Sequence, residues 1–134
     1  MGNMSRRKGI VGEREALKEL GGELGVLLHR NLTQTRFGGA DCTLVKGFAI
    51  EIKRKEDLSR GTWWGQAVRQ AEAIGGVEPM LLYRRNREPW RAFIHTENGN
   101  YREGTMKDAA SAIREKWLAM GEGQGGPVIN EVDS

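Results

Sequence analysis

The stretch GGADCTLVKGFAIEIKRKE, residues 38–56, decides the fold, because it is typical of two strands joined by a tight turn. Residues 42–45 and 48–53 are mainly apolar and rich in β-branched side chains, and Lys46-Gly47 separates them. Asp41, Glu51 and Lys53 nevertheless place charges where a core strand tolerates few. These charges require an explanation in chemistry or in solvent exposure.

Alternate side chains of a strand share a face, so Glu51 and Lys53 are predicted to be neighbours on one surface. Ala49 shares that face, and the other face carries Phe48, Ile50 and Ile52. A three-residue turn, Val45-Lys46-Gly47, pairs Leu44 with Phe48 and brings Asp41 opposite Glu51. A two-residue turn shifts the register by one and sends Asp41 to the opposite face, so the convergence of the two acids depends on the longer turn or on a bulge.

Two converging carboxylates repel each other unless a cation lies between them. With a single cysteine, Cys42, and no histidine in a metal-binding spacing, the ligands are expected to be oxygen atoms, which favours Mg²⁺, with Mn²⁺ as a substitute. Lys53 beside the metal would orient or deprotonate a water molecule, the pattern of metal-assisted phosphodiester hydrolysis. The alternative is a solvent-facing strand with ordinary surface salt bridges, which the Glu-x-Lys spacing alone favours.

Hydrophobic periodicity predicts the elements around this hairpin. The predicted elements are a helix over 8–20 that ends at Gly21-Gly22, a short strand and polar loop over 26–35, a helix over 62–74 with Ser59 as its N-cap, strands over 79–83 and 89–94 paired across the 84–88 turn, and a helix over 106–120. This order predicts an α/β fold with a mixed central sheet flanked by helices. Residues 1–120 would form one domain with a basic arm at 1–8, and residues 121–134 a flexible tail.

Length and composition fit a single domain with a hydrophobic core, since the chain has 134 residues and 38% of them are hydrophobic. No apolar run approaches the ~20 residues of a membrane span, and the N-terminus lacks a signal peptide. An intracellular protein without a membrane partner is therefore expected. The lone cysteine agrees with a reducing compartment.

The charge distribution indicates a polyanionic partner. The net charge is +3, and the last fourteen residues contain three acids and no base, so residues 1–120 carry +6. Bases gather in Arg6-Arg7-Lys8, Lys53-Arg54-Lys55 and Arg84-Arg85-Asn86-Arg87. Such clusters favour a nucleic acid as partner, and solvated loops are the alternative explanation.

The hairpin resembles the PD-(D/E)xK nuclease superfamily, in which an aspartate precedes a strand that bears Glu-x-Lys or Asp-x-Lys. Here these residues are Asp41, Glu51 and Lys53, and Ala40 replaces the proline that usually precedes the aspartate. The resemblance implies a restriction-endonuclease-like fold and a Mg²⁺-dependent nuclease in which Asp41 and Glu51 hold the metal.

Residues 8–95 look most like archaeal-type Holliday junction resolvases. The matching segments, in order, are Lys8-Gly9 with Glu13-Arg14-Glu15, the Asp and Glu-x-Lys hairpin, Gly75-Gly76, the Pro79 strand and Trp90-Arg91-Ala92-Phe93-Ile94. The Trp63-Trp64-Gly65-Gln66 segment is similar to that of related phage domains. The resemblance implies a homodimer that resolves a four-way DNA junction, with each subunit nicking one strand.

The resemblance also implies roles for residues outside the hairpin. Glu13 would be an additional acid at the metal, or else an exposed first-turn glutamate. Gln66 would bind the attacking water or a phosphate, or else be a plain exposed glutamine. Trp63 would stack on an unpaired base, or else belong to the core with Trp64. DNA contacts are expected from Arg6, Arg7, Lys8, Arg14, Arg36, Arg54 and Lys55, whereas His29 and His95 are expected to be structural.

Two other functions remain open at this stage. A phage nuclease that cuts other branched or duplex DNA would use the same catalytic residues. A non-catalytic DNA-binding module would keep the fold, although the intact Asp41, Glu51 and Lys53 argue against it.

Overall fold

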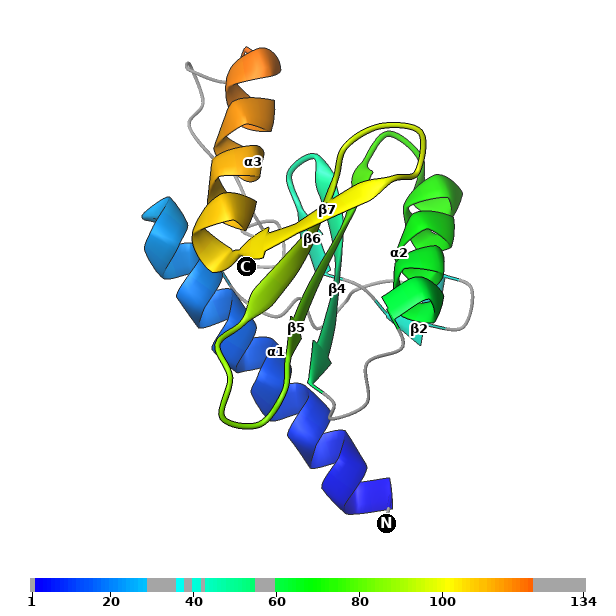
Figure 1. Cartoon of the computed structure of the whole chain (residues 1–134), viewed down its shortest axis with the longest axis vertical. Coiled ribbons are helices and arrows are strands. Elements are labelled where there is room, and N and C mark those ends of the chain that lie inside the picture. The colour runs from blue at the N-terminus through cyan, green and yellow to red at the C-terminus, as the bar shows by residue number, and fades with distance from the viewer. Residues whose placement is uncertain (1, 29–35, 38–39, 42, 55–59, 122–134) are drawn as a thin grey trace.

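A five-stranded sheet in the order β3-β4-β5-β6-β7 forms the centre of the protein (Figure 1). The computed structural model describes residues 2–28, 36–37, 40–41, 43–54 and 60–121, with the backbone alone for residues 2–11, 36–37, 40–41 and 60. The strands are β3 (Thr43–Val45), β4 (Phe48–Arg54), β5 (Glu78–Arg84), β6 (Arg91–His95) and β7 (Tyr101–Thr105). Strands β4 and β5 are parallel and the other neighbours antiparallel, which confirms the predicted mixed sheet.

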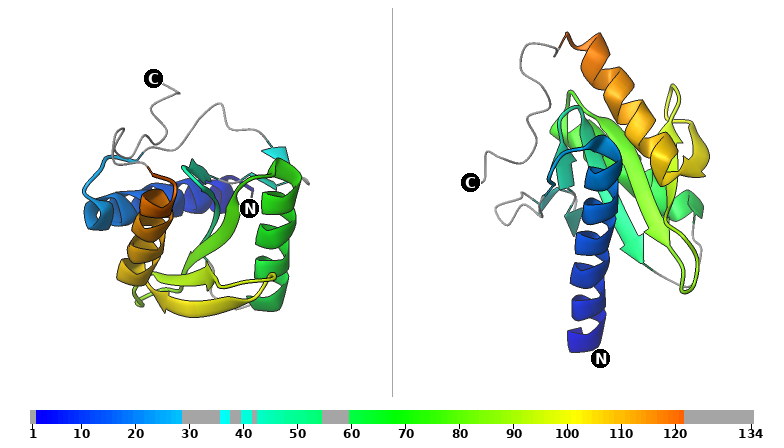
Figure 2. Two further views of the ribbon diagram at one scale, coloured as in Figure 1. Left: turned by 90° about the horizontal axis from the view of Figure 1, so that it is seen from above. Right: turned by 90° about the vertical axis from the view of Figure 1, so that its left-hand side faces the viewer.

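Three helices cover the two faces of this sheet (Figure 2). Helices α1 (Gly2–Leu24) and α3 (Met106–Ala119) pack on one face, and α2 (Arg60–Ile74) packs on the other. The larger core lies under α1 and α3 and includes Leu17, Phe48, Ile50, Met80 and Ile113. None of the described helices is long and apolar enough to cross a membrane.

Helix α1 extends beyond its predicted range at both ends. Residues 2–8 continue the helix, so the predicted basic arm is helical where it is described. The Gly21-Gly22 pair does not end the helix, which reaches Leu24 before Gly25 adopts a φ of 78°. Gly21 has a different role, because a Cβ atom there would lie 2.6 Å from the carbonyl oxygen of Val26, where the chain folds back over the helix.

The turn between β3 and β4 has two residues, Lys46 and Gly47, so of the two turns that the sequence left open the shorter one is formed. Val45 pairs with Phe48, and Leu44 pairs with Ala49 instead of Phe48. The physical reason is that the Val45 side chain is 1% exposed and lies in the core under α1 and α3, so Val45 belongs to the strand.

Three short strands occur where the sequence predicted none. Strands β1 (Arg36–Phe37) and β2 (Ala40–Asp41) form a small antiparallel pair separate from the main sheet. The edge strand β7 carries Arg102 and Glu103 and is largely exposed, so it lacks the apolar run that marked the other strands. Of the strand and loop predicted over 26–35, residues 26–28 contain no strand, and residues 29–35 lie outside the described residues. The predicted N-cap Ser59 also lies outside them.

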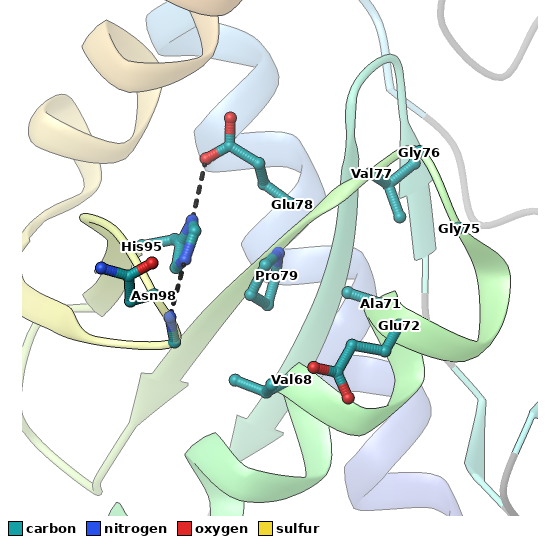
Figure 3. A pocket seen from close by; sticks show the side chains of 11 residues that line it. Val68, Ala71, Glu72, Gly75, Gly76, Val77, Glu78, Pro79, His95 and Asn98 are labelled. Carbon is teal, nitrogen blue, oxygen red and sulfur yellow. Dashed lines mark hydrogen bonds and ion pairs between the residues drawn. The ribbon is translucent and has the colours of Figure 1, made fainter.

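The start of β5 is tied to α3 through one acidic side chain. Glu78 Oε2 accepts a hydrogen bond from Lys116 Nζ at 2.8 Å, and Glu78 Oε1 lies 3.2 Å from His95 Nδ1. The backbone N–H of Gly99 donates to His95 Nε2 at 3.3 Å, so the proton of the neutral ring lies on Nδ1 and points to Glu78 (Figure 3). His95 therefore has the structural contacts expected of it, whereas His29 lies outside the described residues.

A pocket of about 360 Å³ opens beside this network, between the end of α2 and the turn after β6 (Figure 3). Its lining includes Val68, Glu72, Pro79 and Asn98. The pocket adjoins the first residues of β5, so it lies at the opposite end of the sheet from Lys53, whose neighbour Tyr83 stands near the end of β5.

We expect the Glu78 network to make stability depend on pH. Burial by itself raises the pKa of Glu78, but the hydrogen bonds and charges of Lys116 and His95 outweigh it and lower the pKa overall. A lowered pKa stabilises the fold above the ordinary value of 4.5, and this contribution is lost as the pH falls through the lower value of the folded state. The free energy of unfolding of Glu78→Gln should therefore fall less steeply than that of the wild type below pH 4.5.

Urea unfolding between pH 7 and pH 3 measures this effect. Glu72→Gln is the matched control, because it removes the same charge from an exposed residue that lines the same pocket. Equal pH dependence for Glu78→Gln and the wild type would contradict the assignment.

Candidate active site

The predicted face of β4 is confirmed by its neighbours. Glu51 is in register with Leu81 of β5, and Lys53 is in register with Tyr83. Leu81 and Tyr83 both pack under α2, in a cluster with Trp63 and Trp64. Because register partners on adjacent strands share a face, Glu51 and Lys53 point toward α2, while Phe48 and Ile50 face α1 and α3.

Glu51 and Lys53 form a shielded ion pair. The Lys53 Nζ atom lies 3.3 Å from Glu51 Oε2, and the Glu51 side chain is only 6% exposed against 20% for Lys53. Removing a carboxylate from water costs several kcal/mol unless a cation and hydrogen bonds compensate. The alternative of an ordinary surface salt bridge is therefore wrong for Glu51, which is a buried acid with its cation at the rim.

Glu13 lies in the middle of α1, so it is not a first-turn glutamate. Its Oε2 accepts a hydrogen bond from Thr43 Oγ1 at 3.2 Å, and Thr43 is fully buried. Thr43 pairs with Ile50, which places it on the α1 side of the sheet. Glu13 thus contacts the hairpin from the face opposite to that of Glu51.

The backbone of Asp41 belongs to β2, where it pairs with Arg36 of β1. Strand β2 does not continue the ladder between β3 and β4, so the register of that ladder does not extend to Asp41. The Asp41 side chain and residue Cys42 lie outside the described part of the chain. The convergence of Asp41 with Glu51 therefore stays a prediction, and since the three-residue turn is not formed, it now depends on a bulge.

Helix α2 carries two glutamines past the strand that bears Glu51. Trp63 packs on Tyr83 with ring centroids 6.0 Å apart, at the level of Lys53, and Ala71 packs on Ala49. Gln66 and Gln70 lie between these two levels and share one side of the helix with Trp63. Trp63 is 5% exposed, so its proposed stacking on an unpaired base is wrong and it belongs to the core.

Gln70 is a buried polar residue of α2 that the sequence did not single out. Its side chain is 5% exposed, and within the described residues its Oε1 has no hydrogen-bond partner. Leaving a buried amide oxygen unpaired costs about 1–3 kcal/mol, so this position is unusual for a glutamine. Its i+4 spacing from Gln66 was the available signal, whereas Gln66 itself is half-buried.

The residues predicted to contact DNA do not all lie on one surface, and several of them are described only in part. Arg54 faces α1, with Nε 3.8 Å from Glu15 Oε1, and Arg14 is exposed on α1. Backbone alone is described for Arg6, Arg7, Lys8 and Arg36, which lie in α1 and β1, and Lys55 lies outside the described residues.

A family model described as "Phage putative PDDEXK endonuclease" matches residues 4–120. The match spans α1 through α3 and includes the whole sheet. No curated protein and no solved structure matches the chain.

Proposed function

Because the chain belongs to the phage putative PDDEXK endonuclease family, we propose that it is a Mg²⁺-dependent DNA endonuclease that resolves four-way junctions as a homodimer. The observation that carries the proposal is the buried Glu51 carboxylate with Lys53 Nζ 3.3 Å away. A buried acid and a partly exposed lysine on one strand are the groups that a hydrolytic site needs. Its DNA substrate would place the enzyme in the host cytoplasm.

The donor chemistry of the site fits a hard divalent cation. Mg²⁺ and Mn²⁺ prefer oxygen ligands, and Glu51 supplies a carboxylate at a largely water-free position. The described side chains contain no group of three His, Cys, Asp or Glu residues that could hold a metal, so the proposed site needs Asp41 as well. Glu51 and Asp41 would hold the ion, whereas Glu13, which contacts Thr43 on the α1 side of the sheet, would act on it only through water.

When bound, the ion would polarise the phosphate and make a water molecule acidic enough to attack it. The Lys53 ammonium stands at the rim of the site, with 20% of its side chain exposed, where it would orient the attacking water. Gln66, half-buried on α2, would donate a hydrogen bond to the water or to a phosphate oxygen. The water would lose a proton to solvent as its oxygen bonds to phosphorus, one P–O ester bond would break, and the departing oxygen would take up a proton.

The junction substrate and the homodimer come from the resemblance of residues 8–95 to the resolvases. A four-way junction offers two equivalent strands, and a two-fold symmetric dimer presents two equivalent sites, so the symmetries match. A nuclease for other branched DNA would have the same Glu51 and Lys53 arrangement.

Substitution of the two site residues tests the catalytic assignment. Glu51→Gln and Lys53→Ala should each lower the rate of Mg²⁺-dependent cleavage at least ~100-fold, because each removes a group that acts in the transition state. DNA affinity should change by less than about threefold, since phosphate contacts elsewhere dominate it. Lys107→Ala, an exposed lysine on α3, is the charge-matched control for Lys53→Ala. Unchanged cleavage and metal dependence in Glu51→Gln would refute the enzyme proposal.

A substrate panel tests the junction assignment separately. A synthetic four-way junction, a flap, a nicked duplex and a linear duplex share one sequence, and cleavage rates are compared at equal enzyme concentration. We expect the junction to be cut at least about tenfold faster than the linear duplex, a difference of ~1.4 kcal/mol. Equal rates on all four would leave a nuclease but exclude a junction resolvase.

A further inference from the structure

Two arginines stand side by side where β4 and β5 end. Arg54 is the last residue of β4, Arg84 is the last residue of β5, and the parallel register pairs them directly. Both follow the alternation that points Ile52 and Leu82 toward α1, so the two side chains lie on the α1 face. Like charges directly across neighbouring strands destabilise a sheet unless an acid lies between them.

Glu15 of α1 is that acid. Its Oε1 accepts hydrogen bonds from Arg84 Nη1 at 2.6 Å and from Trp90 Nε1 at 3.1 Å, and Arg54 Nε lies 3.8 Å away. Burial by itself raises the pKa of Glu15, but these hydrogen bonds and the two positive charges outweigh it and lower the pKa overall. Glu15 therefore remains ionised and draws both guanidinium groups to one point.

Further contacts fix the orientation of each guanidinium. Arg84 Nε donates to the carbonyl oxygen of Glu88 at 2.8 Å, and Arg54 Nη1 donates to Asn86 Oδ1 at 3.2 Å. The Arg54 stem lies so close to α1 that a Cβ atom on Gly12 would be 3.1 Å from the Arg54 Cβ. The arginines are thus held in place before any ligand arrives, which lowers the entropy cost of binding.

Both guanidinium groups keep the capacity to bind an anion. Each has five N–H donors, and the contacts above use Nε and Nη1. The side chains remain 21% and 26% exposed. The turn after β5 adds Arg85 and Arg87, so positive charge exceeds the negative charge of Glu15 and Glu88 at this end of the sheet.

We propose that Arg54 and Arg84, organised by Glu15, form a phosphate-binding pair that holds the DNA backbone beside the cleavage site. The identity of the ligand as DNA rests on the proposed function. Lys53 and Arg54 are consecutive, so β4 presents one to the α2 face and the other to the α1 face. A strand of DNA that crosses the ends of β4 and β5 therefore meets the Glu51 and Lys53 pair on one side and the arginine pair on the other.

Equilibrium binding to a labelled four-way junction without divalent ions tests the arginine pair. Arg84→Ala and Arg54→Ala should each weaken binding about 3- to 10-fold and reduce the slope of log K against log salt by about one. Arg102→Ala, an exposed arginine on β7, removes the same charge and should leave the slope close to that of the wild type. Equal effects from all three variants would overturn the proposal, because they would reflect net charge alone.

Glu15 provides a second test in which net charge and positioning predict opposite results. Glu15→Ala and Glu19→Ala each raise the net charge by one, and Glu19 is an exposed glutamate on the same helix. Charge alone predicts slightly tighter DNA binding for both variants. The proposal predicts that Glu15→Ala binds at least about threefold more weakly, because the arginines lose their common anchor.

Circular dichroism and thermal unfolding show whether Glu15→Ala is folded. If Glu15→Ala is unfolded, Glu15→Gln replaces it, because glutamine keeps a hydrogen-bond acceptor for Trp90 and Arg84. If a folded Glu15 variant binds DNA more tightly than the wild type, Glu15, Arg54 and Arg84 form only an internal ion-pair network, and the phosphate-pair proposal is refuted. The binding experiments do not depend on catalysis. If Glu51→Gln loses cleavage but Arg84→Ala binds DNA normally, the phosphate-pair proposal is rejected and the nuclease proposal is retained. If Arg84→Ala weakens DNA binding but the wild-type protein cleaves none of the DNA substrates, the nuclease proposal is rejected and the phosphate pair is retained.

Discussion

The burial of one carboxylate constrains this protein more than any other interaction. Glu51 lies on a central strand that is paired on both sides and covered by α2, so its side chain is 6% exposed. An ionised acid in that position is tolerated only with a nearby cation. Lys53 supplies this cation, because two residues along a strand return the side chain to the same face. The Lys53 side chain is 20% exposed, so the ion pair meets the solvent at the lysine.

The pleat of β4 divides the remaining charges between the two faces of the sheet. Lys53 points toward α2, and Arg54 points toward α1, where Glu15 and Arg84 meet it. Helix α1 also brings Glu13 to the hairpin through Thr43. The end of one strand therefore presents a lysine to one face of the sheet and an arginine to the other.

Sequence reasoning predicted what depends on periodicity and missed what depends on tertiary packing. The alternation of β4 correctly placed Glu51 and Lys53 on one face, because a period of two is a local property. The turn length stayed open because the burial of Val45 in the core under α3 decides it, and local turn preferences do not report that burial. Strand β7 was missed because its exposed residues carry no hydrophobic signal, and pairing with β6 alone defines it. Gln70 was missed because a buried glutamine cannot be told from an exposed one by residue type.

The turn between β3 and β4 is held by contacts with residues that follow much later in the sequence. Trp117 Nε1 donates to the carbonyl oxygen of Lys46 at 2.9 Å, across 71 residues, and the N–H of Glu78 donates to the carbonyl of Gly47 at 2.9 Å. During synthesis the acid and the lysine leave the ribosome long before α3 does. The turn between β3 and β4 therefore gains its hydrogen bond from Trp117 only after α3 has been synthesised and has docked.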